Sequence, residues 1–487
     1  MRRFAIPVFA ALFTLALWAP SAYGQAATEG EHSPNMEFVE NIPYELKNGA
    51  TSITGTDIEF AKIGGRQYAL GGSYMNGMQI VDITNPRDSR IVSLYDCGVT
   101  QGDVQVFRQA SKPGRVFVSY ASDTTGDGTS TCYQEAAALG FDVKKPNGSG
   151  KNGSFIAEIT DPLHPKTVSF VEVTQGTHNG TIHPSGNYLY NSNSDLINSL
   201  ATAPPAIEVF DLTNFAAPTK VTELTLPIHP GLGTESHDIT FKSDGTRAYS
   251  AALSQGVVID TTNPADPSIV STWRDPGINV WHQADPYTTT DANGNERTFI
   301  LVEDEVAGAA GGNVCPSGGF HVYEVTGELE NEPVRVGYWN IDDVGLSSTD
   351  PTGTCTAHVF RIHEREQVMT AAFYNGGVRV VDISGLAGIS LGSTQVTGEG
   401  MKEIGYYRMP DADTWSAKTP QINRKTGDFY LFGNDIGRGL DIYHFDGEGT
   451  KSKNKGRWMS AQEAKIALAD RPAPGTAGTT YICLLDD

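Results

Sequence analysis

The sequence predicts an all-β protein, a seven-bladed β-propeller of four-stranded antiparallel blades, closed by an N-terminal strand that completes the last blade. Three observations predict this fold. A short strand-and-turn pattern recurs seven times, three further strand-like segments accompany the copies, and a segment ahead of the first copy can supply the strand that the last blade lacks. The 53 glycines and 26 prolines among 487 residues suit many short strands joined by turns.

The recurring pattern is a β-branched or aromatic run followed by an acidic residue and a turn signal, as in "GMQIVDITNP". It occurs at residues 77–86, 154–162, 206–214, 256–264, 320–327, 378–385 and 440–447. The acidic position holds Asp82, Glu158, Asp211, Asp260, Glu324 and Asp382, and His444 replaces it in the last copy. We expect these carboxylates to accept backbone N–H groups of the turns that follow, which is a structural role. Four strands repeated seven times, at about 60 residues each, is typical of a propeller.

The ends of the chain complete this organisation. The last blade has no fourth strand after "LDIYHFDGEG", whereas "NMEFVENIPYELKNGA" resembles one, so we place the propeller at residues 36–450. Residues 1–24 combine two arginines, a short apolar run interrupted by proline and a small-residue cleavage site. This predicts a signal peptide rather than a membrane anchor. Residues 25–35 are a predicted linker, and residues 451–487 form a predicted C-terminal appendage with one helix-like segment.

Charge and hydropathy restrict the partners. The net charge of −22 argues against nucleic acid, because binding phosphates requires clustered lysine and arginine. No stretch after the signal peptide reaches about 18 apolar residues, so the mature protein should have no membrane span. We therefore expect an exported, periplasmic or extracellular monomer.

Four of the predicted innermost strands open with histidine. His178, His237, His282 and His358 begin the first strands of blades three to six, and the equivalent positions in the other blades lie near Thr56, Gly102 and Lys418. Because innermost strands line the channel, the four imidazoles should form a ring at one mouth. Kept neutral, each offers a lone pair to a transition metal such as Zn, Cu, Fe, Mn or Ni. A hydrogen-bonded belt of histidines bridged by water is the alternative.

The second strands of the blades end at the same face. Glu303 and Glu305 lie on one side of their strand, because side chains alternate along a strand. Either could complete a metal shell, orient an imidazole or act as a general base, and a solvated acidic loop is the alternative. The turns at 123–130 and 291–296 could bind Ca²⁺, although ordinary turns explain them as well. The predicted cofactor is a divalent transition metal of unknown identity.

Long connections surround this mouth. They join second to third strands at residues 122–153, 195–205 and 306–318, and such a cluster suggests a walled pocket. Export places the five cysteines in an oxidising compartment, where pairing is expected. The disulfides Cys97–Cys132 and Cys315–Cys355 would each hold one of these loops in place, which leaves Cys483 as the odd cysteine.

Two copies of the pattern, "GMQIVDITNPRDSRIVSLYD" and "GVVIDTTNPADPSIVSTWRD", resemble the LVIVD repeat of exported bacterial and archaeal β-propellers. The resemblance spans roughly residues 36–450. It implies an exported propeller and little about chemistry, because a fold alone does not supply a reaction.

Three functions are compatible with these features. The first is an exported binding protein whose channel mouth holds a metal and a small-molecule or extracellular polymeric ligand. The second is a metal-dependent enzyme, a hydrolase or an oxidase, that uses the same histidine cluster. The third is an adhesion or scaffold propeller without a metal.

Overall fold

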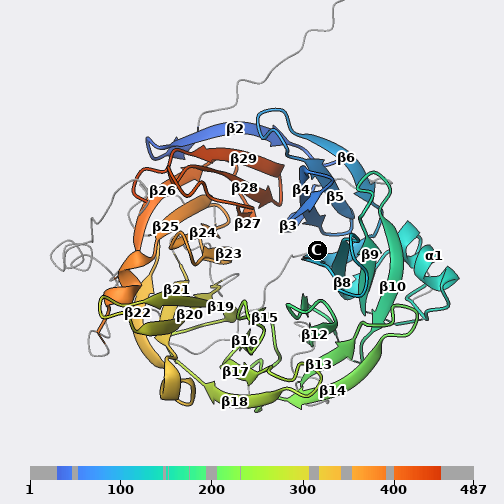
Figure 1. Ribbon diagram of the computed structural model, residues 1–487. Coiled ribbons are helices and arrows are strands. Elements are labelled where there is room, and N and C mark those ends of the chain that lie inside the picture. The colour runs from blue at the N-terminus through green and yellow to red at the C-terminus, as the bar shows by residue number, and fades with distance from the viewer. Residues whose placement is uncertain are drawn as a thin grey trace, which may run out of the picture.

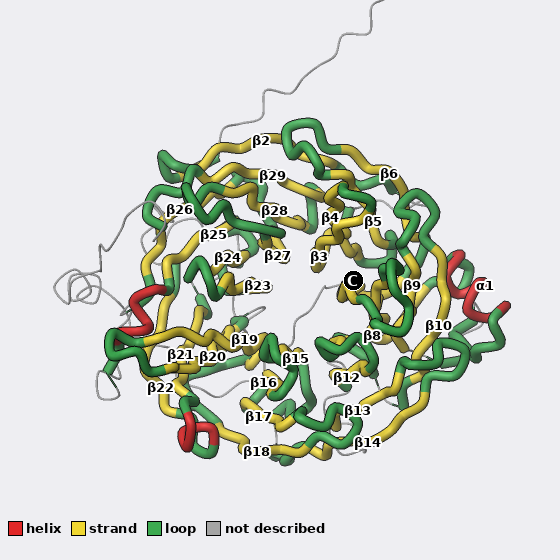
Figure 2. Tube along the Cα trace, in the orientation of Figure 1, coloured by secondary structure: helices red, strands yellow, loops and turns green. Residues whose placement is uncertain are grey.

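The computed structural model confirms the seven-bladed propeller of four-stranded antiparallel blades. It describes residues 30–46, 53–145, 150–151, 153–174, 176–193, 206–230, 232–306, 317–341, 354–390 and 400–450. Seven sheets stand side by side around a central channel (Figure 1). Helix is rare in this part of the chain, as the tube in Figure 2 shows. The helices described are α1 (Thr131–Ala138), η1 (Gly327–Glu330) and η2 (Ser384–Gly388).

The strands form four concentric layers. The innermost strands are β3 (Gly55–Ile63), β7 (Val99–Phe107), β11 (Gly180–Ile182), β15 (Asp238–Phe241), β19 (Trp281–Thr290), β23 (His358–His363) and β27 (Thr414–Lys418). The second strands are β4 (Arg66–Ser73), β8 (Phe117–Gly126), β12 (Tyr188–Ser192), β16 (Arg247–Ala251), β20 (Glu296–Asp304), β24 (Val368–Ala372) and β28 (Phe429–Asp435). The third strands are β5 (Met78–Asp82), β9 (Gly153–Glu158), β13 (Ala206–Asp211), β17 (Gly256–Asp260), β21 (Gly319–Glu324), β25 (Val378–Asp382) and β29 (Gly439–Phe445). The outer strands are β6 (Arg90–Tyr95), β10 (Lys166–Glu172), β14 (Thr219–Thr225), β18 (Ser268–Trp273), β22 (Val334–Trp339), β26 (Lys402–Arg408) and β2 (Met36–Ile42).

The N-terminal strand closes the ring as predicted. Strand β2 pairs antiparallel with β29, from Met36 opposite Phe445 to Ile42 opposite Leu440, and so becomes the fourth strand of blade seven. An ion pair of 2.6 Å between Arg87 and Glu37 ties this strand to blade one. A short strand that the sequence did not predict, β1 (Glu31–His32), pairs with β26 and gives blade six a fifth strand. The predicted linker at 25–35 therefore includes a strand.

The acidic residues of the repeats have the structural role that the sequence predicts. Asp82, Asp211, Asp260 and Asp382 each accept the backbone N–H of the residue two positions later, at 2.7–3.0 Å. In four blades an arginine at or near the start of the second strand also pairs with the acid, as Arg297 does with Glu324. These contacts fix the turn after the third strand.

Apolar side chains pack between neighbouring blades. Leu70 and Ile80 of blade one, for example, share one buried cluster with Tyr120 and Phe155 of blade two. The third strand β13 is buried on both faces, whereas β14 at the rim is mostly exposed. This burial explains why the third strands are nearly continuous apolar runs.

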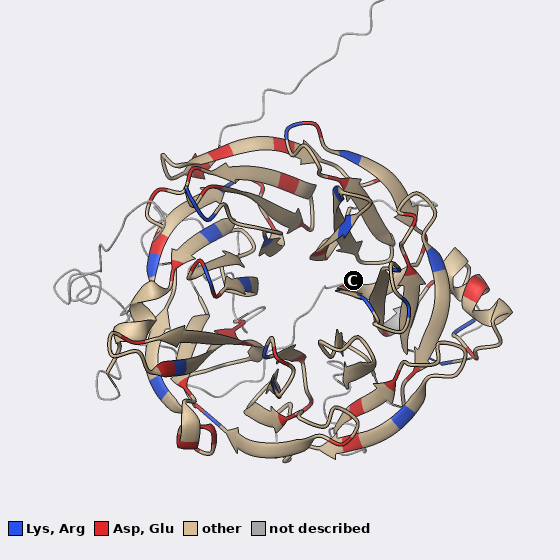
Figure 3. Ribbon diagram, viewed as in Figure 1, with Lys and Arg blue, Asp and Glu red and all other residues tan. Residues whose placement is uncertain are grey.

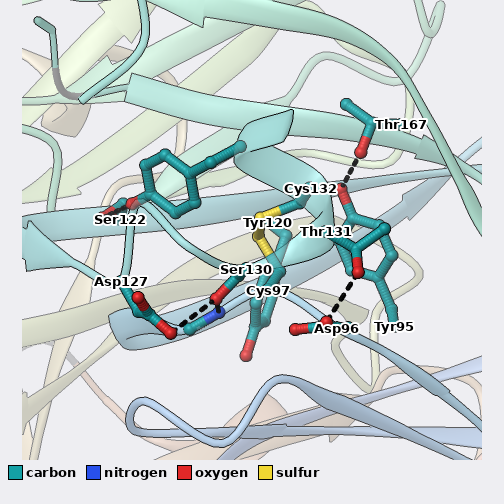
Figure 4. Close-up of a disulfide and its surroundings, with 12 residues drawn as sticks. Tyr95, Asp96, Cys97, Tyr120, Ser122, Asp127, Ser130, Thr131, Cys132 and Thr167 are labelled. Carbon is teal, nitrogen blue, oxygen red and sulfur yellow. Dashed lines mark hydrogen bonds between the residues drawn. A yellow bond between two sulfur atoms is a disulfide. The ribbon is translucent and has the colours of Figure 1, made fainter. Parts of the chain in front are cut away.

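A disulfide joins Cys97 and Cys132, as the sequence predicts, with Cα atoms 5.1 Å apart (Figure 4). It ties α1, within the long connection of blade two, to the end of blade one. Cys355 is also disulfide-bonded, whereas its predicted partner Cys315 lies outside the described residues. Cys483, the predicted signal peptide, the connection at 195–205, most of the connection at 306–318 and the C-terminal appendage also lie outside them. The helices in the described ranges are all too short or too polar to cross a membrane.

Candidate metal centre

The structure brings all four predicted histidines together at one level of the channel. The rings of His178 and His237 lie 4.0 Å apart, those of His237 and His282 4.0 Å, and those of His282 and His358 4.5 Å, measured between centroids. They come from the starts of neighbouring innermost strands in blades three to six. None is more than 3% exposed. The four imidazoles therefore form a buried arc, which we call the histidine arc.

Other residues take this position in blades two and seven. Gly102 takes the position in blade two with φ +73°, and a Cβ there would lie 2.5 Å from the hydroxyl of Tyr120. A side chain of any kind is therefore excluded at this point. In blade seven the position belongs to Trp415, whose ring is 4.5 Å from that of His358. The sequence predicts it near Lys418, three residues further along β27, because the first hairpin is longer in blade seven, where Thr414 pairs with Asp435, than in blade six, where His358 pairs with Ala372.

Backbone carbonyls fix the tautomers of two of these histidines. His237 Nδ1 lies 2.9 Å from the carbonyl oxygen of His282, and His358 Nδ1 lies 2.5 Å from that of Trp415. A carbonyl can only accept, so both Nδ1 atoms carry the hydrogen and donate it. Each Nε2 is then unprotonated and carries a free lone pair. Neither Nε2 has a hydrogen-bond partner among the described residues.

Both of these imidazoles are held neutral. Burial lowers the pKa of His237 well below its ordinary value, and the neighbouring His178 and His282 lower it further. Burial, followed by the charge of His282, has the same effect on the pKa of His358. Neutral imidazoles with a free lone pair are the form in which histidine binds metals.

His282 has a carboxylate in place of the carbonyl. Its Nδ1 lies 3.0 Å from Glu303 Oε2, which orients the ring and leaves Nε2 without a hydrogen-bond partner among the described residues. Burial lowers the pKa of His282, and the charge of Glu305 opposes this shift. Burial raises the pKa of Glu303 well above its usual range, and Asp304 and Asp285 add to the effect. A histidine bridged to a carboxylate through the nitrogen away from the metal is common in zinc sites.

Glu305 lies between two of the free lone pairs. Its Oε2 is 3.6 Å from His282 Nε2, and its Oε1 is 3.6 Å from His358 Nε2. The hydroxyl of Tyr374 donates a 2.7 Å hydrogen bond to Oε1. One ligand atom from each of His282, Glu305 and His358 lies within 4.8 Å of the others, and no other such group of three is found in the described part of the chain. We call these three residues the metal triad.

His178 stands apart from the triad although it lies on the arc. Its Nε2 is 3.0 Å from the side-chain nitrogen of Gln101, and its Nδ1 is 3.4 Å from Asp123. Both ring nitrogens therefore face other side chains. Of the four histidines predicted as ligands, two have the geometry of a triad, and His237 contributes a neighbouring free lone pair.

The two acidic turns considered for calcium use their carboxylates locally. Asp291 Oδ1 accepts the backbone N–H groups of Asn293 and Asn295, both at 2.8 Å. Asp127 Oδ1 accepts the backbone N–H of Thr129 at 2.9 Å. Both are ordinary Asx turns.

A cavity of ≈ 400 Å³ lies in the channel on one side of the histidine arc. His178, His237 and His282 line its inner end, and the exposed Pro184 and Ser243 line its other end. Pro184 and Ser243 lie in turns that join first to second strands. The cavity therefore extends away from the face of the long connections, where the sequence had placed the pocket.

No family model and no curated protein matches the chain. Two solved structures illustrate what it is similar to. The Swd1 β-propeller domain of Myceliophteria thermophila is 10% identical, with 84% of this chain and 99% of that chain covered and a TM-score of 0.46. The periplasmic gluconolactonase of Pseudomonas aeruginosa is 11% identical, with 79% and 97% covered and a TM-score of 0.48. At these identities the likeness is one of fold alone.

Proposed function

We propose that this protein is an exported propeller that binds a divalent transition metal on the metal triad and uses that site to bind a small-molecule or polymeric ligand. The proposal depends on one observation. Three ligand atoms from His282, Glu305 and His358 converge within 4.8 Å, and the two imidazoles present unpartnered Nε2 atoms in a buried site. Burying such lone pairs is costly unless something binds them. Two imidazoles and one carboxylate suit Zn, Fe, Mn, Cu or Ni.

Metal titration tests this proposal. The untagged protein is stripped with a chelator and titrated with each metal in competition with a chromophoric indicator. We expect one metal to bind tightly, and we expect Glu305→Gln to weaken its affinity by about tenfold or more. His164→Ala is the control, because the His164 side chain is 81% exposed. Equal affinity in the wild type and in Glu305→Gln would contradict the proposal.

Catalysis is the second candidate, and the composition of the triad favours it. A metal held by two histidines and one carboxylate keeps open positions, which serve either to activate water in hydrolases or to bind oxygen in oxidases. The test compares ester hydrolysis and oxygen consumption in chelated and reloaded protein. Activity lost on chelation and restored by one metal would identify an enzyme. Binding without either activity would leave the first candidate.

The proposal also includes export of the protein and its membership of the LVIVD repeat family. The Cys97–Cys132 disulfide supports export, because such bonds persist in oxidising compartments. We expect the exported chain to begin at Gln25, directly after the predicted cleavage site. Mass spectrometry of the periplasmic and secreted fractions measures this, and an uncleaved chain confined to the cytoplasm would contradict it.

A further inference from the structure

The channel cavity contains far more acid than base. Acidic and basic residues are drawn in red and blue on the strands nearest the channel in Figure 3. Six carboxylates line the cavity, whereas Arg361 and Lys418 are the cations among its lining residues. The carboxylates belong to Asp57, Glu59, Asp103, Asp238, Asp285 and Glu364.

The two cations are already engaged on one wall. Lys418 Nζ lies 2.6 Å from Asp57 and 3.1 Å from Glu59, and Arg361 pairs with Glu59 as well. These residues belong to blades one, six and seven. That wall is therefore a closed network of ion pairs.

The opposite wall has no such ion pairs, although Asp285 accepts hydrogen bonds from Thr240 and Gln283. Asp103, Asp238 and Asp285, from blades two, four and five, make no ion pair with any lysine or arginine of the described residues. Asp103 accepts only long hydrogen bonds, at 3.3 Å from the backbone of Gly180 and 3.4 Å from Gln105. Burial, with the charge of Asp57, raises the pKa of Asp103 to about 7. We call these three residues the acidic wall.

Two buried polar atoms beside the acidic wall also lack partners. Thr181 Oγ1 and His237 Nε2 have no hydrogen-bond partner among the described residues, and their side chains line the cavity. Thr181 is 6% exposed and His237 1%. Buried polar atoms without partners are uncommon, and an unexplained one indicates a missing ligand, ion or water.

The arrangement discriminates between classes of ligand. Burial raises the pKa of all three carboxyl groups, so they ionise most readily beside a cation, and the ionised wall would repel anions such as phosphates or carboxylates. A single inorganic cation fits poorly, because the three carboxylates are not among the groups whose ligand atoms lie within 4.8 Å of one another. An alkylammonium group carries one charge and three N–H donors and can extend from one carboxylate to the next. A volume of ≈ 400 Å³ is within the range of small-molecule sites.

We propose that the channel cavity is a binding site for a small organic cation with primary ammonium groups, held by Asp103, Asp238 and Asp285. The ammonium groups supply the positive charge that the acidic wall lacks. The hydroxyl of Thr181 and the Nε2 lone pair of His237 hydrogen-bond to the polar part of the ligand. This site adjoins the metal triad at His282, which lines the cavity, whereas Glu305 and His358 do not line it.

Isothermal titration with a matched pair of probes tests the proposal. 1,5-Diaminopentane carries two ammonium groups, and 1,5-pentanediol has the same chain without charge. We expect the diamine to bind at least about tenfold more tightly than the diol. We also expect Asp238→Asn and Asp103→Asn each to lower the affinity for the diamine by about tenfold. Asp266→Asn, an exposed acid of the same blade as Asp238, is the control and should change nothing.

Each other outcome overturns the proposal. If the diamine binds no more tightly than the diol, charge does not select the ligand. If Asp238→Asn and Asp103→Asn bind it as the wild type does, binding lies elsewhere. If Ca²⁺ displaces the diamine, and the same two variants bind Ca²⁺ more weakly than the wild type does, the site binds an inorganic cation. All titrations are repeated in metal-loaded and chelated protein, because amine binding is expected in both and does not depend on the proposed metal function.

Discussion

At the scale of single residues, the histidines of the arc differ in what their Nδ1 atoms contact. His237 and His358 donate to backbone carbonyls, His282 contacts Glu303, and His178 contacts Asp123. The contact at Nδ1 determines whether Nε2 carries a hydrogen or a lone pair. It therefore determines which imidazoles can bind a metal through Nε2. The sequence predicts the four positions, but it does not show which carbonyl each ring meets.

The contact between Glu303 and His282 can be tested by substitution. Glu303→Gln keeps the size of the side chain and replaces the carboxyl group with an amide that cannot ionise, so His282 becomes a weaker ligand. We expect metal affinity to fall by about tenfold or more, with little change in thermal stability. Indicator competition measures the affinity, and Glu328→Gln at an exposed position is the control. Unchanged affinity in Glu303→Gln would show that this carboxylate does not support the site.

Asp103 makes stability depend on pH. Its pKa rises from 3.8 in the unfolded chain to about 7 in the folded protein, so between these values only the folded state binds the proton. The wild type therefore loses stability as pH rises through this window. The amide that Asp103→Asn introduces cannot ionise. The stability gain of Asp103→Asn over the wild type should be near zero at about pH 4 and reach a few kcal/mol at about pH 8. Urea unfolding at both pH values measures it, and an equal gain at both would refute the assignment.

At the scale of elements, bulges at the starts of the innermost strands position the site. The register shifts between Trp281 and Ala284 in β19, and between His358 and Phe360 in β23. A bulge re-aims the side chain beside it, which brings His282 and His358 to the same level. The repeats predict the strands, but a one-residue bulge leaves no reliable mark in the sequence. The longer first hairpin of blade seven, in which Thr414 pairs with Asp435, explains why the sequence predicts this level near Lys418 instead of Trp415.

The connection that carries α1 depends on its disulfide. The Cys97–Cys132 bond closes a loop of 35 residues, and Cys132 is fully buried. In the chain-entropy model, a loop of this length gains about 3–4 kcal/mol. We expect the double variant Cys97→Ala/Cys132→Ala to lose stability of this order in urea unfolding. A loss well below about 1 kcal/mol would show that packing of α1 alone holds the connection.

At the scale of the whole molecule, the periodic patterns of the sequence predicted the seven repeats, the closing strand and the four histidines. The sequence does not predict strand β1, because two residues carry no periodicity, and it does not predict the acidic wall, because the members of that wall follow the histidine level by one or three residues. In three blades an aspartate directly follows the residue at the histidine level: Asp57 after Thr56, Asp103 after Gly102 and Asp238 after His237. An alignment of the innermost strands would reveal this pattern.

Ring closure should govern stability of the whole propeller. Removing residues 1–46 deletes β1 and β2 and leaves β29 and β26 as open edges, with Met36 withdrawn from the core. We expect the midpoint of thermal unfolding to fall by about 10 °C or more relative to a chain that begins at residue 30, with increased aggregation. Differential scanning calorimetry of the two chains measures this. Equal midpoints would mean that the N-terminal strand is dispensable for closure.

The metal content of the untagged protein tests the central claim most directly. Elemental analysis is made on the wild type, on His282→Ala/His358→Ala and on the exposed-site control His164→Ala, all purified in parallel and loaded with the same metals. The account predicts close to one transition-metal ion per chain in the wild type and the control, and less than about a tenth of that in the double variant. Equal metal in all three proteins, or none in any of them after loading, would contradict it.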